Sequence, residues 1–150
     1  MIDLGIRIEF YEHAFEGEPS KGLLGRVERP DGYRALAVPA VGDLIMGPSL
    51  RLGARESVSP YPLPGPMQLP VRGVEHCLVP ERDGEVPAWW DAYTEPGVTI
   101  VLHVSLSLTG SASRCRMIRQ FVADGWVCDG PEGSELGEYV LQAREELGLS

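Results

Sequence analysis

The sequence predicts an α+β fold, in which a curved antiparallel β-sheet or a small open β-barrel is followed by two C-terminal amphipathic helices. Residues 98–108 alternate in side-chain character without a break, which is typical of a strand with one dry face. Several shorter alternating segments precede this strand, and the apolar spacing after it becomes helical. A chain of 150 residues suits a single domain, 1–150, with a β-rich part, 1–108, and a helical part, 109–150.

The first third of the chain contains short strand signals separated by turns. Residues 2–10 alternate cleanly and predict a half-buried strand, whereas the polar, glycine-rich residues 12–25 predict a loop. The segment Pro30-Asp31-Gly32 predicts a hairpin turn, because Asp-Gly between alternating segments favours tight turns. A further short strand is expected over residues 44–46.

The middle of the chain is dominated by prolines and then returns to strand patterns. Residues 59–70 carry five prolines, which indicates an extended, polyproline-like connection rather than a helix or central strand. We favour a stiff surface connection over a P-x-x-P ligand for an SH3-type partner. Residues 71–79 predict a strand, and residues 87–93 predict one or two helical turns that begin at Pro87.

The alternating segment 98–108 is expected in the middle of the sheet. Its dry face is formed by Ile100, Leu102, Val104, Leu106 and Leu108. The other face is more polar and includes a histidine and two serines. We therefore expect the first face in the core, and any functional side chain of this strand on the second.

Two helices are expected after the central strand. Over residues 114–124 an apolar stripe and an arginine-rich face favour a helix, although Asp124-Gly125 also permits a hairpin turn. A short return strand is expected at 126–128. Ser134 is a suitable N-cap for a last helix over 135–147.

Charge and cysteine content restrict the partners. The formal net charge of −9 repels phosphate backbones, so nucleic acid is not expected as a partner. The chain shows neither a signal peptide nor an apolar stretch long enough to cross a membrane, so a cytoplasmic protein with no membrane partner is expected. Three cysteines without paired spacing argue against a disulfide framework and against structural zinc.

The histidines are the first candidates for a binding site. If the strands that carry His76 and His103 pair, both imidazoles could line one pocket, together with Glu9, Glu75 or Cys77. The spacing lacks a metal-ligand signature, so no metal and no cofactor are expected. The plainer interpretation of His76 is a packed, hydrogen-bonded core residue.

The densest aromatic cluster lies in the second half of the β-rich part. Trp89, Trp90 and Tyr93 could line a ligand pocket or anchor a partner, although a core-capping tryptophan is equally simple. Ser105 and Ser107 lack the G-x-S-x-G context of a nucleophile, and no phosphate-binding glycine loop occurs. No catalytic residue is assigned, and the sequence leans against an enzyme.

Basic residues gather visibly only once, at Arg114, Arg116 and Arg119. In so acidic a chain these side chains are expected to form ion pairs with its own carboxylates. Two functions remain open. The first is a non-enzymatic protein-interaction module, either an acidic immunity or inhibitor-type protein or a self-assembling one, whose partner is another protein or a homo-oligomer. The alternative is a small-molecule-binding protein or minor enzyme with a pocket near His76, His103 and Trp89.

Overall fold

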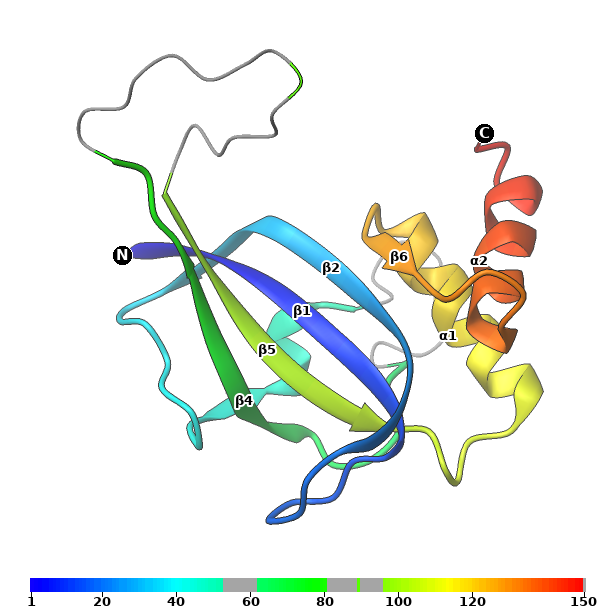
Figure 1. Cartoon of the computed structure of the whole chain (residues 1–150), viewed down its shortest axis with the longest axis horizontal. Coiled ribbons are helices and arrows are strands. Elements are labelled where there is room, and N and C mark those ends of the chain that lie inside the picture. The colour runs from blue at the N-terminus through cyan, green and yellow to red at the C-terminus, as the bar shows by residue number, and fades with distance from the viewer. Residues whose placement is uncertain (53–61, 81–88, 90–95, 150) are drawn as a thin grey trace.

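A computed structural model describes residues 1–52, 62–80, 89 and 96–149 of the chain. Its elements are, in chain order, β1 (Ile2–His13), β2 (Lys21–Ala35), β3 (Leu44–Met46), the 3₁₀ helix η1 (Gly47–Leu50), β4 (Gln68–Cys77), β5 (Gly97–Ser105), α1 (Ser111–Ala123), β6 (Val127–Asp129) and α2 (Glu135–Glu146). The predicted α+β class is confirmed, since a curved sheet precedes two C-terminal helices (Figure 1).

The six strands form one open sheet in the order β3-β4-β5-β1-β2-β6. The short strands β3 and β6 lie at the two edges, so the open sheet, and not the barrel, is the alternative that the protein adopts. The expectation of a purely antiparallel sheet is wrong at one pairing, because β1 runs parallel to β5. Alternation reports which side chains are buried, but it carries no information on strand direction.

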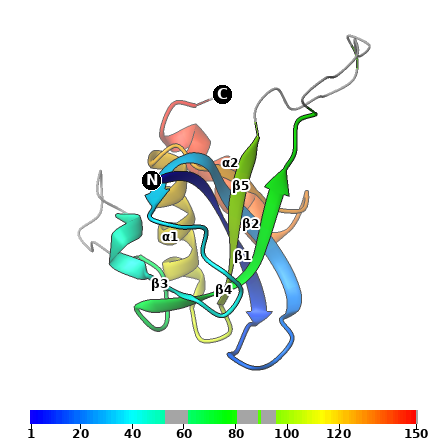
Figure 2. The same cartoon turned by 90° about the vertical axis from the view of Figure 1, so that its left-hand side faces the viewer.

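The core lies between one face of the sheet and the helices. Alternate residues in the middle of β1 and β5, including Ile8, Phe10, Ile100 and Leu102, are buried there. Figure 2 shows α1 and η1 on the same side of the strands, and their buried side chains join the same apolar cluster. The ring of Phe121 from α1 packs edge-on against Phe10, with centroids 6.0 Å apart. The predicted dry face is confirmed except at Leu108, which lies beyond β5 and is 97% exposed.

Strand β2 covers the end of the predicted loop and the whole of the predicted hairpin turn. The loop expected over 12–25 is shorter in the structure, because β1 runs on to His13 and β2 begins at Lys21. Pro30-Asp31-Gly32 does not form a hairpin turn; β2 continues through it, with a shift in its register against β1 between Leu4 and Ile6. The irregularity lies opposite Gly5, where an added Cβ would come within 2.5 Å of the carbonyl oxygen of Pro30.

The C-terminal part follows the sequence prediction closely. The helix expected over 114–124 is α1, so the hairpin alternative is wrong, and β6 is the expected return strand. The hydroxyl of Ser134 accepts a hydrogen bond from the N–H of Gly137, which caps α2 as expected. Arg114 and Arg119 form ion pairs with glutamates of α2, as predicted for this arginine cluster. In the described part of the chain, no helix is both long and apolar enough to cross a membrane.

The sheet face opposite the core carries charged and polar side chains, and we call it the outer face. The guanidinium of Arg7 donates to both carboxylate oxygens of Glu75, and its Nε lies 3.5 Å from Glu9. These contacts raise the pKa of Arg7 and lower that of Glu75. Neither helix covers the outer face, so its side chains are held in place by contacts along and across the strands.

Candidate functional site

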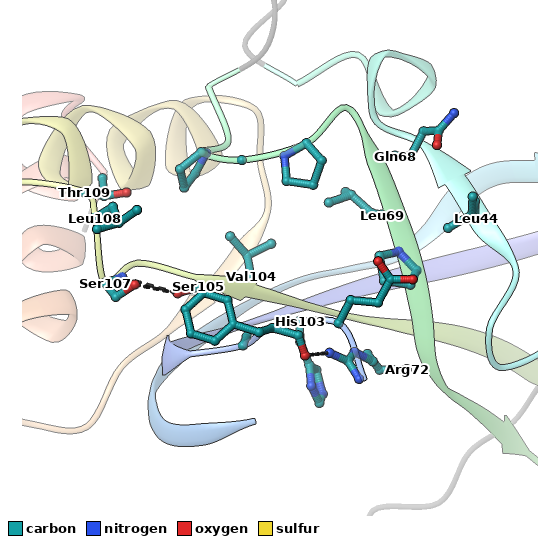
Figure 3. A pocket seen from close by; sticks show the side chains of 17 residues that line it. Leu44, Gln68, Leu69, Arg72, His103, Val104, Ser105, Ser107, Leu108 and Thr109 are labelled. Atoms are coloured by element: carbon teal, nitrogen blue, oxygen red, sulfur yellow. Dashed lines mark hydrogen bonds between the residues drawn. The ribbon is translucent and has the colours of Figure 1, made fainter. Parts of the chain in front are cut away.

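A cavity of about 460 Å³ opens at the end of the sheet where β1 and β5 both finish. Most of its wall is apolar and comes from segments that are far apart in the sequence. The wall includes Phe15, Leu44, Leu69, Val104 and Leu108. Figure 3 shows Leu69, Val104 and Leu108 around this space, and we call it the apolar cavity.

The parallel pairing of β1 and β5 explains the place of the apolar cavity. Parallel strands bring their carboxyl ends to the same edge, so the segments that follow them leave the sheet together. Here the N–H of Leu106 donates to the carbonyl of Tyr11 at 2.9 Å, and the Ser105 hydroxyl donates to the carbonyl of Glu12 at 3.2 Å. These bonds hold the two departing segments side by side.

Arg72 is the cationic side chain in the wall of the apolar cavity. One of its terminal nitrogens donates to the carbonyl of Phe15 at 2.6 Å, as Figure 3 shows. Its Nε is buried and has no hydrogen-bond partner among the described residues. No described carboxylate forms an ion pair with it, although Glu16 also lines the cavity. A guanidinium N–H buried without an acceptor is costly, so this position favours a ligand that brings one.

His103 is fixed by contacts on both sides of its ring. Its Nδ1 lies 2.6 Å from the hydroxyl oxygen of Ser20, and its Nε2 lies 3.2 Å from a carboxylate oxygen of Glu9. The same Glu9 oxygen accepts a hydrogen bond from the hydroxyl of Tyr11. The carboxylate favours the tautomer with the proton on Nε2, which leaves Nδ1 to accept the proton of Ser20.

Burial keeps this imidazole in its neutral form. Desolvation is the main cause that lowers the pKa of His103 below 6.5, and the positive charges of Arg72 and Arg7 act in the same direction. The Glu9 carboxylate opposes them but does not reverse the shift. At neutral pH the wall of the apolar cavity therefore contains an uncharged histidine beside a charged arginine.

The contacts of His103 resemble those that activate a serine nucleophile, but their position does not fit that role. An imidazole held by a carboxylate and accepting from a hydroxyl is the general arrangement for such activation. Ser20, however, is not part of the wall of the apolar cavity, whereas His103 is. The contacts therefore hold the ring in place as part of the wall.

The two histidines singled out in the sequence do not meet. Strands β4 and β5 pair as the hypothesis required, but His76 lies opposite Val98, about 16 Å along the strand from His103. The two side chains also lie on opposite faces, because Val98 shares the core face and His103 the outer face. The expectation that His76 is a packed core residue is also wrong, since it is exposed beyond the covered part of that face.

Trp89, the described residue of the predicted aromatic cluster, does not line the apolar cavity. Trp89 belongs to the connection that leaves β4 after Cys77 and enters β5 at Gly97, and it is 84% exposed. Trp90 and Tyr93 lie outside the described residues. Of the three predicted binding-site residues that the structure describes, His76, His103 and Trp89, only His103 lines the cavity.

Sequence reasoning missed Arg72, Phe15 and Leu44 as parts of this site. Nothing in their local pattern sets them apart, because their proximity depends on which strands become neighbours. Among the described residues no three His, Cys, Asp or Glu side chains come together as metal ligands do. Comparisons with protein-family models, curated proteins and solved structures find no match to this chain.

Proposed function

We propose that the protein binds a small molecule with a largely apolar body and a carboxylate in the apolar cavity. The single observation that supports this most is Arg72, which lines the cavity and whose buried Nε has no acceptor among the described residues. A ligand carboxylate would supply the missing acceptor and the missing counter-charge together.

The size and wall of the apolar cavity agree with such a ligand. Its volume of about 460 Å³ lies within the range of ordinary small-molecule sites, and such sites are mostly apolar with a few polar groups that fix orientation. The hydroxyls of Ser107 and Thr109 are the polar groups of the wall that suit this role, because both ring nitrogens of His103 already contact Ser20 and Glu9. The exposed Glu16 carboxylate repels an anion, so it should lower the affinity of the cavity for a carboxylate ligand.

Calorimetric titration with octanoate, phenylacetate and octanol tests the proposal. Both carboxylates should bind more tightly than the alcohol, because only they pair with Arg72. Replacing Arg72→Gln should weaken octanoate binding about 10- to 100-fold, which corresponds to one charge-assisted hydrogen bond. Glu16→Gln should strengthen it.

A matched variant separates local from general charge effects. Arg116→Gln removes one positive charge from an exposed position on α1. The Arg116 guanidinium donates to the hydroxyl of Ser113, outside the cavity. The variant should leave octanoate affinity unchanged. If neither carboxylate binds, or if the Arg72 and Arg116 variants weaken binding equally, the proposal is wrong.

A second candidate function, self-association, is supported by the edge strand β3. Leu44 and Met46 project from this edge, both about half exposed, and Met67 lies beside them with 54% exposure. An unpaired edge with apolar side chains favours addition of another strand. Light scattering after size-exclusion chromatography should then show dimers that Met46→Glu dissociates; a monomer at high concentration would exclude this candidate.

We also propose a reducing, cytoplasmic location with proteins or small molecules, and not nucleic acid, as partners. The support is the charge of −9 and the three cysteines, all within the described residues and all free thiols. Burial raises the pKa of Cys128 to about 12, so this thiol is unreactive at neutral pH.

A further inference from the structure

A second cavity, of about 560 Å³, lies beside the C-terminal half of β2, and its wall is basic where that of the first cavity is mostly apolar. Three arginines line it, Arg29, Arg34 and Arg51, together with one acidic residue, Asp124. The wall thus carries a formal charge of +2 in a chain whose net charge is −9. We call it the basic cavity.

Each of the first two arginines is held by a specific contact. The guanidinium of Arg29 lies 5.4 Å from the ring centre of Tyr33 and packs on Gly32, where an added Cβ would come within 3.1 Å of it. The Nε of Arg34 lies 3.3 Å from a carboxylate oxygen of Asp3. Arg29 precedes, and Tyr33 follows, the irregular segment of β2 that does not form the predicted hairpin turn.

Arg51 is the third arginine and the most unusual residue of the cavity. Its φ of 52° is the only positive value recorded for a non-glycine residue in the described part of the chain. Arg51 is the C-cap of η1, and its N–H donates to the carbonyl of Pro48; a left-handed residue is common at a helix end, but glycine or asparagine is more usual there than a residue as long as arginine. No described carboxylate forms an ion pair with Arg51. The hydroxyl of Tyr33 donates to the carbonyl of Leu50 at 2.8 Å and so fixes the neighbouring backbone.

We propose that the basic cavity binds the phosphate group of a small molecule. Guanidinium groups match phosphate oxygens in geometry and remain charged at all physiological pH values. The positive wall complements a phosphate group, and the net charge of −9 disfavours a long nucleic acid in favour of a small ligand. Departures from regular structure in β2 and at Arg51 together bring the three arginines to one place.

Titration at low ionic strength with inorganic phosphate, pyrophosphate and phenyl phosphate tests this site. At least one should bind with a dissociation constant in the millimolar range or tighter, and the affinity should fall with added salt. Tightest binding of phenyl phosphate would identify a phosphorylated organic molecule as the ligand, and equal binding of all three would identify free phosphate.

Arg51→Gly is the most informative variant. Glycine accepts the positive φ, so the melting temperature should stay constant or rise, whereas phosphate affinity should fall at least threefold. Arg51→Asn tests the same loss with another residue that tolerates this backbone, in case the glycine variant does not fold. Arg116→Gln again matches the change in charge and should leave the affinity unchanged.

The affinities of the Arg51 and Arg116 variants for phosphate decide between the presence and the absence of this site. A threefold or larger loss in either Arg51 variant, with normal binding by the Arg116 variant, supports the phosphate site. Absence of binding for all three probes, a smaller loss, or an equal loss in the Arg116 control overturns it. Octanoate binding at the apolar cavity is measured in the same proteins and should not change, so the two sites are tested separately.

Discussion

The apolar and basic cavities differ in how the sequence builds them. The apolar cavity lies where β1 and β5 end together, and its floor is formed by regular strand residues such as Val104 and Leu69. The basic cavity instead depends on irregular backbone, namely the register shift in β2 and the positive φ of Arg51. One site follows from the ordinary geometry of a sheet, whereas the other requires exceptions to it.

This difference indicates which site is more sensitive to changes in stability. Where strand residues form the wall, the apolar cavity shares the stability of the sheet, because these residues cannot move without breaking strand pairing. A cavity made by strained backbone can rearrange at lower cost, since the strain is relieved in the process. Substitutions should therefore affect the two cavities unequally, and the following variants test this expectation from the largest effect to the smallest.

Removing the ring of Phe121 should have the largest effect. This side chain is buried under the sheet, 6.0 Å from the ring of Phe10 and 5.1 Å from that of Trp126. Phe121→Ala should lower the free energy of unfolding by about 3–5 kcal/mol in urea denaturation. Trp126 lines the basic cavity, so phosphate binding should suffer more than octanoate binding; a larger loss for octanoate would reverse the comparison.

A methyl group at Gly5 should break the basic cavity selectively. The added Cβ would lie 2.5 Å from the carbonyl oxygen of Pro30, so β2 must move at its irregular segment. Gly5→Ala should cost about 1–3 kcal/mol of unfolding free energy and weaken phosphate binding, with octanoate affinity retained. Gly110→Ala is the control, because an added Cβ meets no atom within 4 Å there.

Loss of the α2 cap should spare both cavities. Ser134 contributes neither to the apolar nor to the basic cavity, and its hydroxyl accepts from the N–H of Gly137. Ser134→Ala should lower the unfolding free energy by about 1 kcal/mol. Both ligands should then bind with unchanged affinity, and a loss at either site would show that binding follows general stability instead of local geometry.

The pH dependence of stability between pH 5 and 7 should include a contribution from His103 in the wall of the apolar cavity. The folded-state pKa of His103 lies below 6.5, so the unfolded chain binds the proton more readily than the folded one. The stabilising contribution is therefore complete above pH 6.5 and is lost as the pH falls towards the folded pKa. In His103→Gln this part of the slope should disappear from denaturation curves recorded between pH 5 and 7; an unchanged slope would assign it to other groups.

The sequence predicts where the helices and strands of this fold lie better than it predicts which strands pair with each other. The alternation of β1 and β5 and the apolar stripe of α1 identify buried faces correctly, since periodicity directly reports burial. The alternation of β1 and β5 does not indicate that the two strands pair, or that they pair in parallel. The separation of His76 from His103 has the same origin, because register decides which residues are opposite each other.

The candidate sites were less accessible to sequence reasoning. His103 was identified because a histidine on the polar face of a central strand is noticeable, but Arg72 carries no such signal. Arg29, Arg34 and Arg51 are not adjacent in the sequence. They line one cavity because β2 lies beside η1, where Tyr33 donates to the carbonyl of Leu50. Asp31-Gly32 has the composition of a hairpin turn, yet the long pairing of β2 with β1 overrides this local preference.

The parallel pairing of β1 with β5 also sets the order in which the chain can fold. Strands β1 and β2 are neighbours in sequence and can pair as soon as both have left the ribosome. The other side of β1 must wait, because Ile6 pairs with Ile100 and the intervening loop must close first. During synthesis β1 is therefore a half-paired strand with an open edge until Gly97–Ser105 emerges, and this is the interval in which a nascent chain is most exposed to misassembly or to chaperones.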